Sequence, residues 1–398
     1  MTKDALRILM ITPTPYFSDR GCHVRIYEEA RALTKLGHEV CIVTYHLGRD
    51  MPGVLVERIP RVPWYNKLEA GPSWHKPYLD ILLLWKSLAV ARIFRPHLIH
   101  AHLHEGALIG YFLKLLIRRP LLFDYQGSLT GESINHGFLN KRSPLTHIFK
   151  WFEHAINHLA DLIITSSDQG RQELVTDWGI SPGRLINLID GVDTEVFHPY
   201  PRSEARRELG IPDNVKLVVY LGLFNRYQGV DLLLDAISLL RGKYSDMRFL
   251  LMGFPDEEYR RKAVEMCIDD VIIFTGRIRY ERAAFFLSAG DLAVSPKLAL
   301  TEANGKLFNY MACGVPTVSF ESNINREILG EAGIYVEHGN CAALADTIVA
   351  SLCDSEAMIS LSKRVRERAV NMHSWSSRSL QLESIYRTLL SMRLNADS

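Results

Sequence analysis

The amino-acid sequence predicts an α/β protein made of two doubly wound, Rossmann-like domains. Residues 7–44 follow the order strand, glycine-containing loop, helix and strand, which commonly opens a doubly wound sheet. An alternation of strands and helices starts again at Lys216 and continues to Val336. A chain of 398 residues is long enough to form the two hydrophobic cores that this pattern requires.

The composition is ordinary for a globular chain, with 47% hydrophobic and 23% charged residues. Residues 1–190 contain 22 Lys and Arg against 18 Asp and Glu, a net charge of +4. Residues 191–398 contain 24 against 27, a net charge of −3. Neither value indicates the concentrated basic face that nucleic acids require, so we expect no nucleic-acid partner. The first half retains a mild attraction to anionic partners.

The six cysteines are scattered, with no Cys-x-x-Cys and no histidine pair at metal-ligand spacing. We interpret them as reduced thiols and expect no bound metal ion. The N-terminus runs from charged residues directly into a short strand and lacks the apolar region of a signal peptide. The apolar stretch Tyr78 to Phe94 is interrupted by Lys86 and Arg92 and is too short to span a bilayer. We therefore expect a cytoplasmic protein.

The first strand is predicted at Arg7 to Ile11, followed by a loop through Ser18 to Cys22. A helix is predicted at Val24 to Leu36, which Gly37 ends, and Glu39 to Thr44 is the next strand. Gly21 in the loop would let the backbone approach a ligand closely.

The next elements are a strand at Val54 to Ile59, an irregular segment at Arg61 to Pro77 and a helix at Tyr78 to Arg95. A strand then ends in His100-Ala-His102, with His104 just beyond it. Alternation along the strand places these three histidines on one face. They are either polar residues of a strand end or part of a ligand site.

A helix is predicted at Leu108 to Ile117 and a strand at Pro120 to Phe123. A polar, glycine-containing loop follows from Asp124 to Glu132, and such loops often carry function. Asp124, Gln126 and Glu132 either orient the hydroxyls of an acceptor substrate or close the loop by hydrogen bonds.

Residues 141–159 mix basic residues with Phe149, Trp151 and Phe152. One interpretation is a solvated helix with an aromatic stripe that faces the core. The other is a peripheral contact with an anionic membrane, on its inner face. Further strands are predicted at Leu162 to Ser166 and at Leu185 to Ile189.

The stretch Thr301 to Val318 has the strongest functional pattern. A buried strand ends at Ser295, a loop follows, and helical spacing begins at Asn304 and Gly305. The first amides of such a helix and its positive dipole end are suited to a phosphate group. Lys306 would neutralise a diphosphate, while Glu302 and Asn309 would hold sugar or ribose hydroxyls. The alternative from this stretch alone is an ordinary helix start with a solvated lysine.

Met311-Ala-Cys-Gly-Val-Pro316 resembles the donor-site segment of the family 4 retaining glycosyltransferases, of the group 1 type. The Gly21-Cys22 loop, the Gly-His-Glu-Val strand entry, the His-x-His strand end and Asp190-Gly-Val-Asp193 resemble the same family. The resemblance implies the glycosyltransferase B fold, in which two domains face each other across a cleft. It implies an acceptor-side domain at 1–190, a nucleotide-sugar domain at 191–375, and a closing helix at 376–398 that crosses back to the first domain.

The resemblance also implies the activity: a retaining, metal-independent hexosyltransferase that uses a nucleotide sugar, either UDP- or GDP-linked, and no cofactor. The absence of Asp-x-Asp agrees with a metal-free mechanism. The acceptor would be a glycan, a lipid-linked sugar or a small molecule. The candidate catalytic residues are His102, Glu302 and Lys306. The candidate donor-binding residues are Gly21, Cys22, Arg226, Gln228, Asn304, Gly305 and Asn309, and the acceptor-side residues are Asp124, Gln126 and Glu132.

The sequence departs from the family pattern at two places. Asn309 stands where the family has its second glutamate, and Thr301, next to Glu302, stands where it has the first. In Gly222 to Gly229, Leu223 and Gln228 replace the usual arginine and lysine. Either Lys306 or Arg226 would then supply the positive charge. The alternative function is a nucleotide-sugar-binding protein of the same fold with weak or absent transfer activity.

Overall fold

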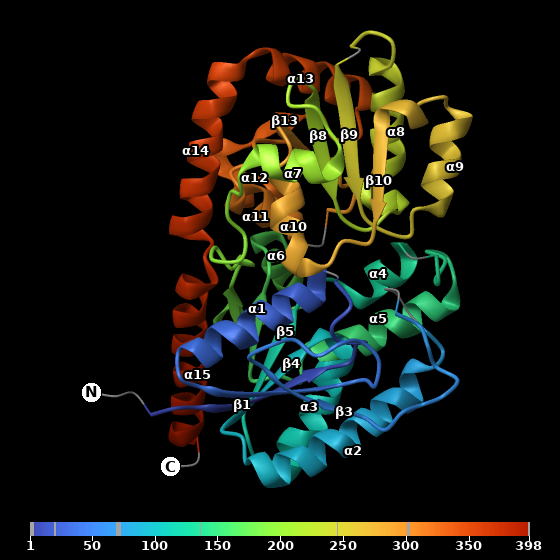
Figure 1. Cartoon of the computed structure of the whole chain (residues 1–398). Helices are drawn as coiled ribbons and strands as arrows, with labels where there is room; N and C mark the ends of the chain where they lie inside the picture. Colours follow the sequence, from blue (N-terminus) through green and yellow to red (C-terminus); the bar gives the residue numbers. More distant parts are fainter. Residues whose placement is uncertain are drawn as a thin grey trace.

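The computed structural model describes residues 4–19, 21–68, 73–135, 137–244, 246–300 and 303–396. The chain forms two parallel sheets, each covered by helices on both faces, stacked along the long axis of the molecule (Figure 1). The predicted pair of doubly wound sheets is therefore confirmed, and their arrangement is the glycosyltransferase B fold.

The first sheet has the strand order β3-β2-β1-β4-β5-β6-β7. Its strands are β1 (Arg7–Thr12), β2 (Glu39–Thr44), β3 (Leu55–Arg58), β4 (Leu98–His102), β5 (Leu121–Tyr125), β6 (Leu162–Thr165) and β7 (Leu185–Asn187). Strand β1 is central, with Arg7 opposite Glu39 of β2 and Ile8 opposite Leu98 of β4. Since all pairs are parallel, the carboxyl ends of the strands lie along one edge, where open α/β sheets bind ligands.

The helices of the first half are α1 (Gly21–Lys35), α2 (Lys76–Phe94), α3 (Leu103–Ile117), α4 (Leu129–Asn135), α5 (Pro144–Asn157) and α6 (Asp168–Thr176). Strands such as β4 and β5 are buried along their whole length because helices cover both faces of the sheet. Within 61–77, the described residues 61–68 and 73–75 lack helix and strand, as predicted.

The second sheet has the order β10-β9-β8-β11-β12-β13. Its strands are β8 (Lys216–Leu221), β9 (Met247–Met252), β10 (Ile272–Gly276), β11 (Leu292–Ser295), β12 (Thr317–Phe320) and β13 (Ile334–Val336). Its helices are α7 (Arg202–Leu209), α8 (Val230–Leu240), α9 (Glu257–Glu265), α10 (Tyr280–Leu287), α11 (Lys306–Ala312), α12 (Asn323–Leu329) and α13 (Cys341–Cys353).

The chain ends in two long helices, α14 (Ser355–Met372) and α15 (Trp375–Ala396), which run along one side of the molecule (Figure 1). Helix α15 packs against α1 of the first half. The hydroxyl of Tyr386 on α15 lies 2.7 Å from Nδ1 of His100 on β4. The domain limits after residues 190 and 375 stay predictions.

Three contacts, two of them fully buried, join α1 to the second half through one carboxylate. Glu28 accepts hydrogen bonds from the hydroxyl of Tyr280 at 2.7 Å, the indole nitrogen of Trp375 at 2.7 Å and the amide of Asp193 at 3.2 Å. Burial raises the pKa of Glu28 to about 7, although these donors act in the opposite direction.

Several predicted element limits are wrong in ways that matter for the site. Helix α1 begins at Gly21, so Gly21 and Cys22 form its first turn and not a loop. Helix α3 begins at Leu103, directly after His102, and not at Leu108. Apolar periodicity does not mark this early start because the first turn holds polar residues that face a cavity.

The polar segment after β5 also differs from the prediction. Asp124 belongs to β5, and Glu132 lies on the short helix α4, so only residues 126–128 form a loop. In the part of the chain that the structure describes, no helix combines the length and apolarity needed to cross a bilayer.

Candidate active site

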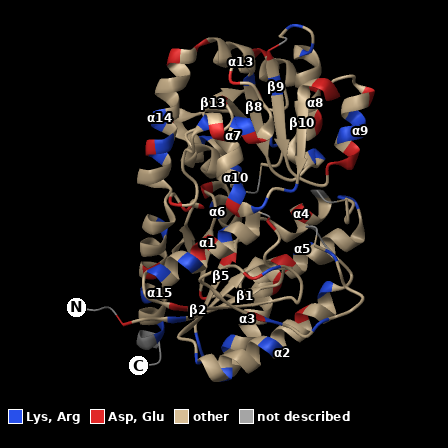
Figure 2. Ribbon diagram, viewed as in Figure 1, with Lys and Arg blue, Asp and Glu red and all other residues tan. Residues whose placement is uncertain are grey.

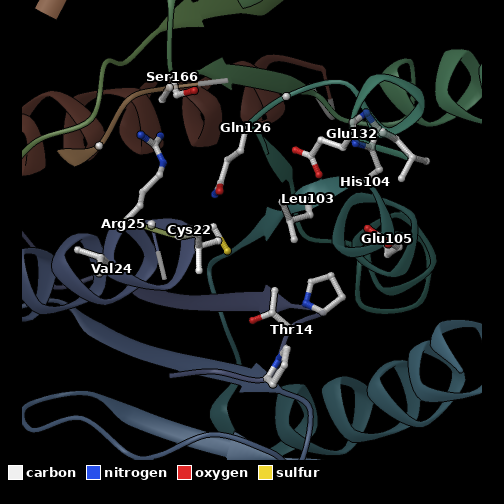
Figure 3. Close-up of a pocket in the computed structure, with 18 of the residues that line it drawn as sticks. Thr14, Cys22, Val24, Arg25, Leu103, His104, Glu105, Gln126, Glu132 and Ser166 are labelled. Atoms are coloured by element: carbon white, nitrogen blue, oxygen red, sulfur yellow. The ribbon is translucent and has the colours of Figure 1, made fainter. Parts of the chain in front are cut away.

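One large cavity of about 920 Å³ lies between the two halves of the chain. Its walls come from α1 and the carboxyl ends of the first sheet on one side, and from the loops after β8, β9 and β11 on the other. Figure 3 shows side chains of Cys22, Leu103, Gln126 and Glu132 around one part of it. The cavity occupies the edge at which both parallel sheets present their strand ends, as this class of fold predicts.

Lys306, at the start of α11, is the main cation on the wall formed by the second half. Its ammonium donates a hydrogen bond to the amide oxygen of Gln228 at 2.6 Å and to the hydroxyl of Tyr220 at 3.3 Å. The same ammonium lies 4.5 Å from the centre of the Tyr220 ring. In the described part of the chain, these are its hydrogen-bond partners, and both are uncharged.

The position of Lys306 has a strong electrostatic consequence. Burial, and in addition the charge of Lys297, lowers the pKa of Lys306 well below that of a lysine in water. Lys297 also lines the cavity, and its ammonium donates to the carbonyl of Ala303 at 2.7 Å. An anion in the cavity would oppose both effects, because it supplies the negative charge that Gln228 and Tyr220 lack.

The glycine loop after β8 approaches Lys306 closely. Gly222 has a φ of +157°, and a Cβ at this position would lie 3.0 Å from the Lys306 ammonium. Leu223 and Gln228 of this loop line the cavity. Gln228 therefore stands at a position where the family pattern has a cation, and its amide oxygen accepts a hydrogen bond from Lys306.

Arg226, the alternative cation, lies elsewhere. It begins a short 3-10 helix and lines a second hollow, of about 660 Å³, together with Asp231 and Lys262. It is outside the residues that line the large cavity. The prediction that Arg226 shares the donor site is therefore not supported by its position.

Asn304, Gly305 and Asn309 all line the large cavity, as predicted. The side-chain nitrogen of Asn304 donates to Ser295 at 2.9 Å and to Asn325 at 2.8 Å, which ties the loop to β11 and α12. Its amide oxygen is buried and has no hydrogen-bond partner among the described residues.

Helix α11 begins at Lys306 and not at Asn304, so the predicted helix start is wrong by two residues. The residues before it form a tight turn, in which the amide of Leu307 donates to the carbonyl of Asn304 at 3.0 Å. Lys306 consequently occupies the first helical position. Glu302, the third candidate catalytic residue, lies outside the described residues, as does Thr301.

Asp124 is the centre of a buried ion-pair network on the opposite wall. Arg25 on α1 binds it with two nitrogens, at 2.9 and 3.0 Å, and also pairs with Asp190. Burial alone would raise the pKa of Asp124, but Arg25 and the hydrogen bond from His102 hold that pKa well below its usual value. The network therefore joins β4, β5, α1 and the segment between the two sheets.

His102 lies behind this network. Its Nδ1 is 2.9 Å from Asp124, and burial lowers its pKa despite the neighbouring carboxylate. The ring is fully buried and is not among the residues that line the cavity, although Leu103 and Gln126 on either side of it are. The expectation that His102 lines the sugar pocket is therefore wrong for this arrangement, because its pairing with Asp124 turns the ring inwards.

Gln126 connects the buried network to the cavity. Its side-chain nitrogen donates to Asp124 at 2.8 Å and lies 3.3 Å from Nδ1 of His102. Both Gln126 and Glu132 line the cavity, whereas Asp124 does not. Gly21 and Cys22 also line it, but a Cβ at Gly21 would meet open space. Close packing therefore does not require glycine at position 21.

The turn from β4 into α3 is strained. Leu103 has a φ of +62°, which is unfavourable for a branched residue, and it lines the cavity. This backbone directs the first turn of α3 into the cavity, including His104 and Glu105. Sequence reasoning did not identify Leu103 or Glu105, since no motif marks them.

A second polar group lies on the cavity wall formed by the first half, where Lys76 of α2 pairs with Glu105. Tyr45 donates to Asp80 at 2.5 Å. Burial and the charge of Glu105 raise the pKa of Asp80 to about 7. Sequence reasoning also missed this group, because its members come from three separate elements.

Four potential metal ligands also meet in the core: Glu29, His100, His102 and Asp124 offer ligand atoms within 4.8 Å of one another. Both Glu29 oxygens lack a hydrogen-bond partner among the described residues. Arg25, however, already supplies positive charge to Asp124, so a metal cation here would meet a guanidinium at close range. The sequence does not indicate this cluster, because Glu29 matches the pattern of an ordinary polar residue in an amphipathic helix.

Two Rossmann-like sheets that face each other across a cavity, with a buried lysine at a glycine loop on one wall, define an enzyme of the glycosyltransferase B class. Two family models match the chain: "Glycosyl transferase 4-like domain" at residues 20–187 and "Glycosyl transferases group 1" at residues 215–354. The chain belongs to the family 4, group 1 glycosyltransferases. It is a glycosyltransferase.

The comparisons with individual proteins agree. A D-inositol 3-phosphate glycosyltransferase of Corynebacterium efficiens is 26% identical over 388 residues, which cover 92% of this chain and 90% of the relative. The structure of a sucrose-phosphate synthase from Thermosynechococcus elongatus is similar, with a TM-score of 0.82, 21% identity and coverage of 97% and 100%. Anabaena Alr3699/HepE in complex with UDP and glucose has a TM-score of 0.75, 16% identity and coverage of 96% and 100%.

Proposed function

We propose that this chain is a retaining, metal-independent glycosyltransferase that moves a hexose from a UDP- or GDP-sugar to a hydroxyl of a glycan or lipid-linked acceptor. The observation that carries the proposal is the buried Lys306, whose partners in the described residues are uncharged. A buried cation of this kind is stabilised by an anionic ligand, and the diphosphate of the donor is such an anion.

The donor diphosphate would lie against Lys306 and the glycine loop at Gly222. The nucleoside would then extend into the second half, and the sugar would face Gln126 and Glu132 across the cavity. That a HepE structure of the same fold holds UDP and glucose supports a nucleotide sugar as the ligand. We propose Asn309 and Glu302 as contacts to the sugar.

The reaction would exchange one bond at the anomeric carbon for another. The bond between the sugar and the terminal phosphate oxygen breaks, and a bond from the acceptor oxygen forms on the same face. The acceptor proton passes to the departing phosphate oxygen, whose charge Lys306 stabilises. Asp124 is buried and bound by Arg25 with two hydrogen bonds, so it is unsuited to act as a nucleophile.

His102 would act on this reaction as a positioning residue, through Asp124 and Gln126. The neutral imidazole of His102 holds Asp124 in place through Nδ1, and Asp124 in turn orients the Gln126 amide that lines the cavity.

We also propose a cytoplasmic location, with peripheral contact to the inner face of the membrane. The scattered spacing of the six cysteines favours a reducing compartment.

The donor is tested by calorimetric titration with UDP-, GDP- and ADP-sugars, followed by an assay of nucleotide release without an acceptor. A transferase should slowly hydrolyse the sugar that it binds, at a rate that EDTA does not change. Complete loss of turnover in EDTA would contradict the metal-free mechanism. Tight binding without turnover under any acceptor mixture would favour the second candidate, a binding protein with a degenerate donor motif.

A further inference from the structure

The large cavity does not end at the proposed reaction centre. It continues into the first half, where residues of α2, α3 and α5 line it. Helix α3 packs against both α2 and α5. The residues of α3 that line it extend from Leu103 to Phe112. With a rise of 1.5 Å per residue, this distance along the helix is about 13 Å. The cavity therefore has a branch that a donor at Lys306 does not fill.

The chemistry of the walls changes along this branch. At its inner end, beside the reaction centre, it is lined by the charged side chains of Lys76, Glu105 and Glu132. Farther out the walls are apolar, with Ile81 and Leu84 of α2, Leu108 and Phe112 of α3, and Phe149 and Phe152 of α5. A ligand that fills the branch consequently has a polar group at one end and an apolar chain at the other.

The branch leads to a surface with many exposed apolar side chains. Trp85 on α2 is 64% exposed, Leu115 on α3 is 57% exposed, and Trp151 on α5 is 64% exposed. A group of large apolar side chains at the surface commonly marks an interaction site. Tryptophan in particular suits the boundary between water and a bilayer.

Basic residues predominate in three segments that form this surface. Residues 81–97, 106–119 and 137–152 each contain three Lys or Arg and no Asp or Glu. Two of these cations are paired with acids from other segments, Lys86 with Glu57 and Lys114 with Asp161. Figure 2 shows the basic residues along α2. Segments that carry both basic and exposed apolar residues suit contact with an anionic membrane.

We propose that the apolar branch between α2, α3 and α5 binds the hydrocarbon chain of an amphiphilic acceptor, which enters from an anionic membrane that these helices contact. The proposal rests on the proposed transferase function. The ligand is expected to be amphiphilic because the apolar branch is continuous with its polar inner end. A hydrocarbon chain bound in the branch would be joined to a polar head group at that end. There, Glu105 and Glu132 would accept hydrogen bonds from the hydroxyls of the acceptor head group.

The branch is tested with n-hexyl, n-octyl and n-decyl β-glucosides, each below its critical micelle concentration, titrated by calorimetry in the presence of UDP. Burial of one methylene group is worth up to about a fourfold change in Kd. We expect the affinity of the unmodified protein to rise with chain length by two- to fourfold per methylene, on the order of this limit.

Leu108→Trp is the test variant, because it adds bulk to the wall of the branch. Leu115→Trp is the matched control, since it lies two turns farther along the same side of α3, is also exposed, and does not line the cavity. The increase in affinity per methylene group should largely disappear in Leu108→Trp and persist in Leu115→Trp. Equal slopes in the two variants, or no dependence on chain length in the unmodified protein, would overturn the proposal.

Membrane contact is tested by sedimentation with vesicles of phosphatidylcholine, with and without phosphatidylglycerol. We expect binding to the anionic vesicles that weakens with salt and with the double change Lys141→Glu and Lys150→Glu. Absence of binding at low ionic strength would refute the membrane source of the acceptor. Binding of UDP or GDP by the same preparations separates this outcome from failure of the proposed function, since absence of binding to both nucleotides would contradict only the latter.

Discussion

The ammonium of Lys306 donates a hydrogen bond to the amide oxygen of Gln228 over 2.6 Å, across the wall of the cavity. In the family pattern a cation is expected at position 228, and we propose that Lys306 in the first turn of α11 supplies the positive charge instead. The amide that remains in the old position now orients the lysine. This pair gives three predictions about donor binding.

Replacement of the lysine should impair both donor affinity and rate. A hydrogen bond to a charged group contributes about 1.5 to 3 kcal/mol, so Lys306→Ala should lower kcat/KM by about 10- to 100-fold. Lys306→Arg should recover part of the lost kcat/KM, since the positive charge is kept but the geometry of the hydrogen bond to Gln228 is not. Steady-state kinetics with the identified donor would measure both.

Arg226→Ala is the control for this series. Arg226 lines the smaller hollow and not the large cavity, so its removal should change kcat/KM little. If Arg226→Ala abolished turnover while Lys306→Ala remained near the unmodified level, the donor cation would lie on the loop after β8.

Gln228→Glu should weaken donor binding although it preserves the shape of the side chain. The new carboxylate would pair with Lys306 at the present 2.6 Å, and the diphosphate would have to compete with it. We expect an increase in the donor Kd of about tenfold or more, which corresponds to at least about 1.4 kcal/mol. Calorimetry would detect it, and unchanged affinity would show that the diphosphate does not contact Lys306.

Donor binding should take up protons. The pKa of Lys306 is lowered well below its usual value in the empty protein, and a bound diphosphate should raise it. Between the two pKa values the free lysine is neutral and the bound one is charged, so affinity should fall as pH rises through this interval. Titrations in buffers of different ionisation enthalpy would measure the uptake. In Lys306→Arg, which stays charged throughout, the uptake due to this residue should vanish.

Glu28 should make the stability of the protein depend on pH. Its folded-state pKa of about 7 is above the usual value of 4.5, so the folded state binds the extra proton. The stabilisation is fully present below the unfolded pKa and is lost as pH rises through 7, by up to about 3 kcal/mol. This loss corresponds to about 3 °C in Tm for a chain of this size.

Glu28→Gln removes this titration, and it is compared with the unmodified protein by calorimetry at pH 5 and pH 8. The Tm of the variant should improve relative to the unmodified protein as pH rises. A constant Tm difference would mean that Glu28 is ionised in the fold at both values. Other buried acids titrate equally in both proteins, so they cancel in the comparison.

Much of the fold was determined by local sequence pattern. Short apolar runs such as Glu39 to Thr44 match the observed strands, because the fully buried strands of a parallel sheet need such runs and the turns between them need polar residues and glycine. The place of Lys306, Gly305 and Asn309 on the cavity also followed from one local unit, namely strand, loop and helix. Local spacing is sufficient when all members of a site belong to one such unit.

Tertiary structure alone decided how distant residues meet. Arg25 and Asp124 are 99 residues apart, and their ion pair turns His102 away from the cavity that the motif assigned to it. The same holds for Lys76 with Glu105, and for the branch between α2, α3 and α5. The physical reason is that periodicity reports which face of one element is buried, whereas pairing energies and cavity shape depend on how several elements pack against one another.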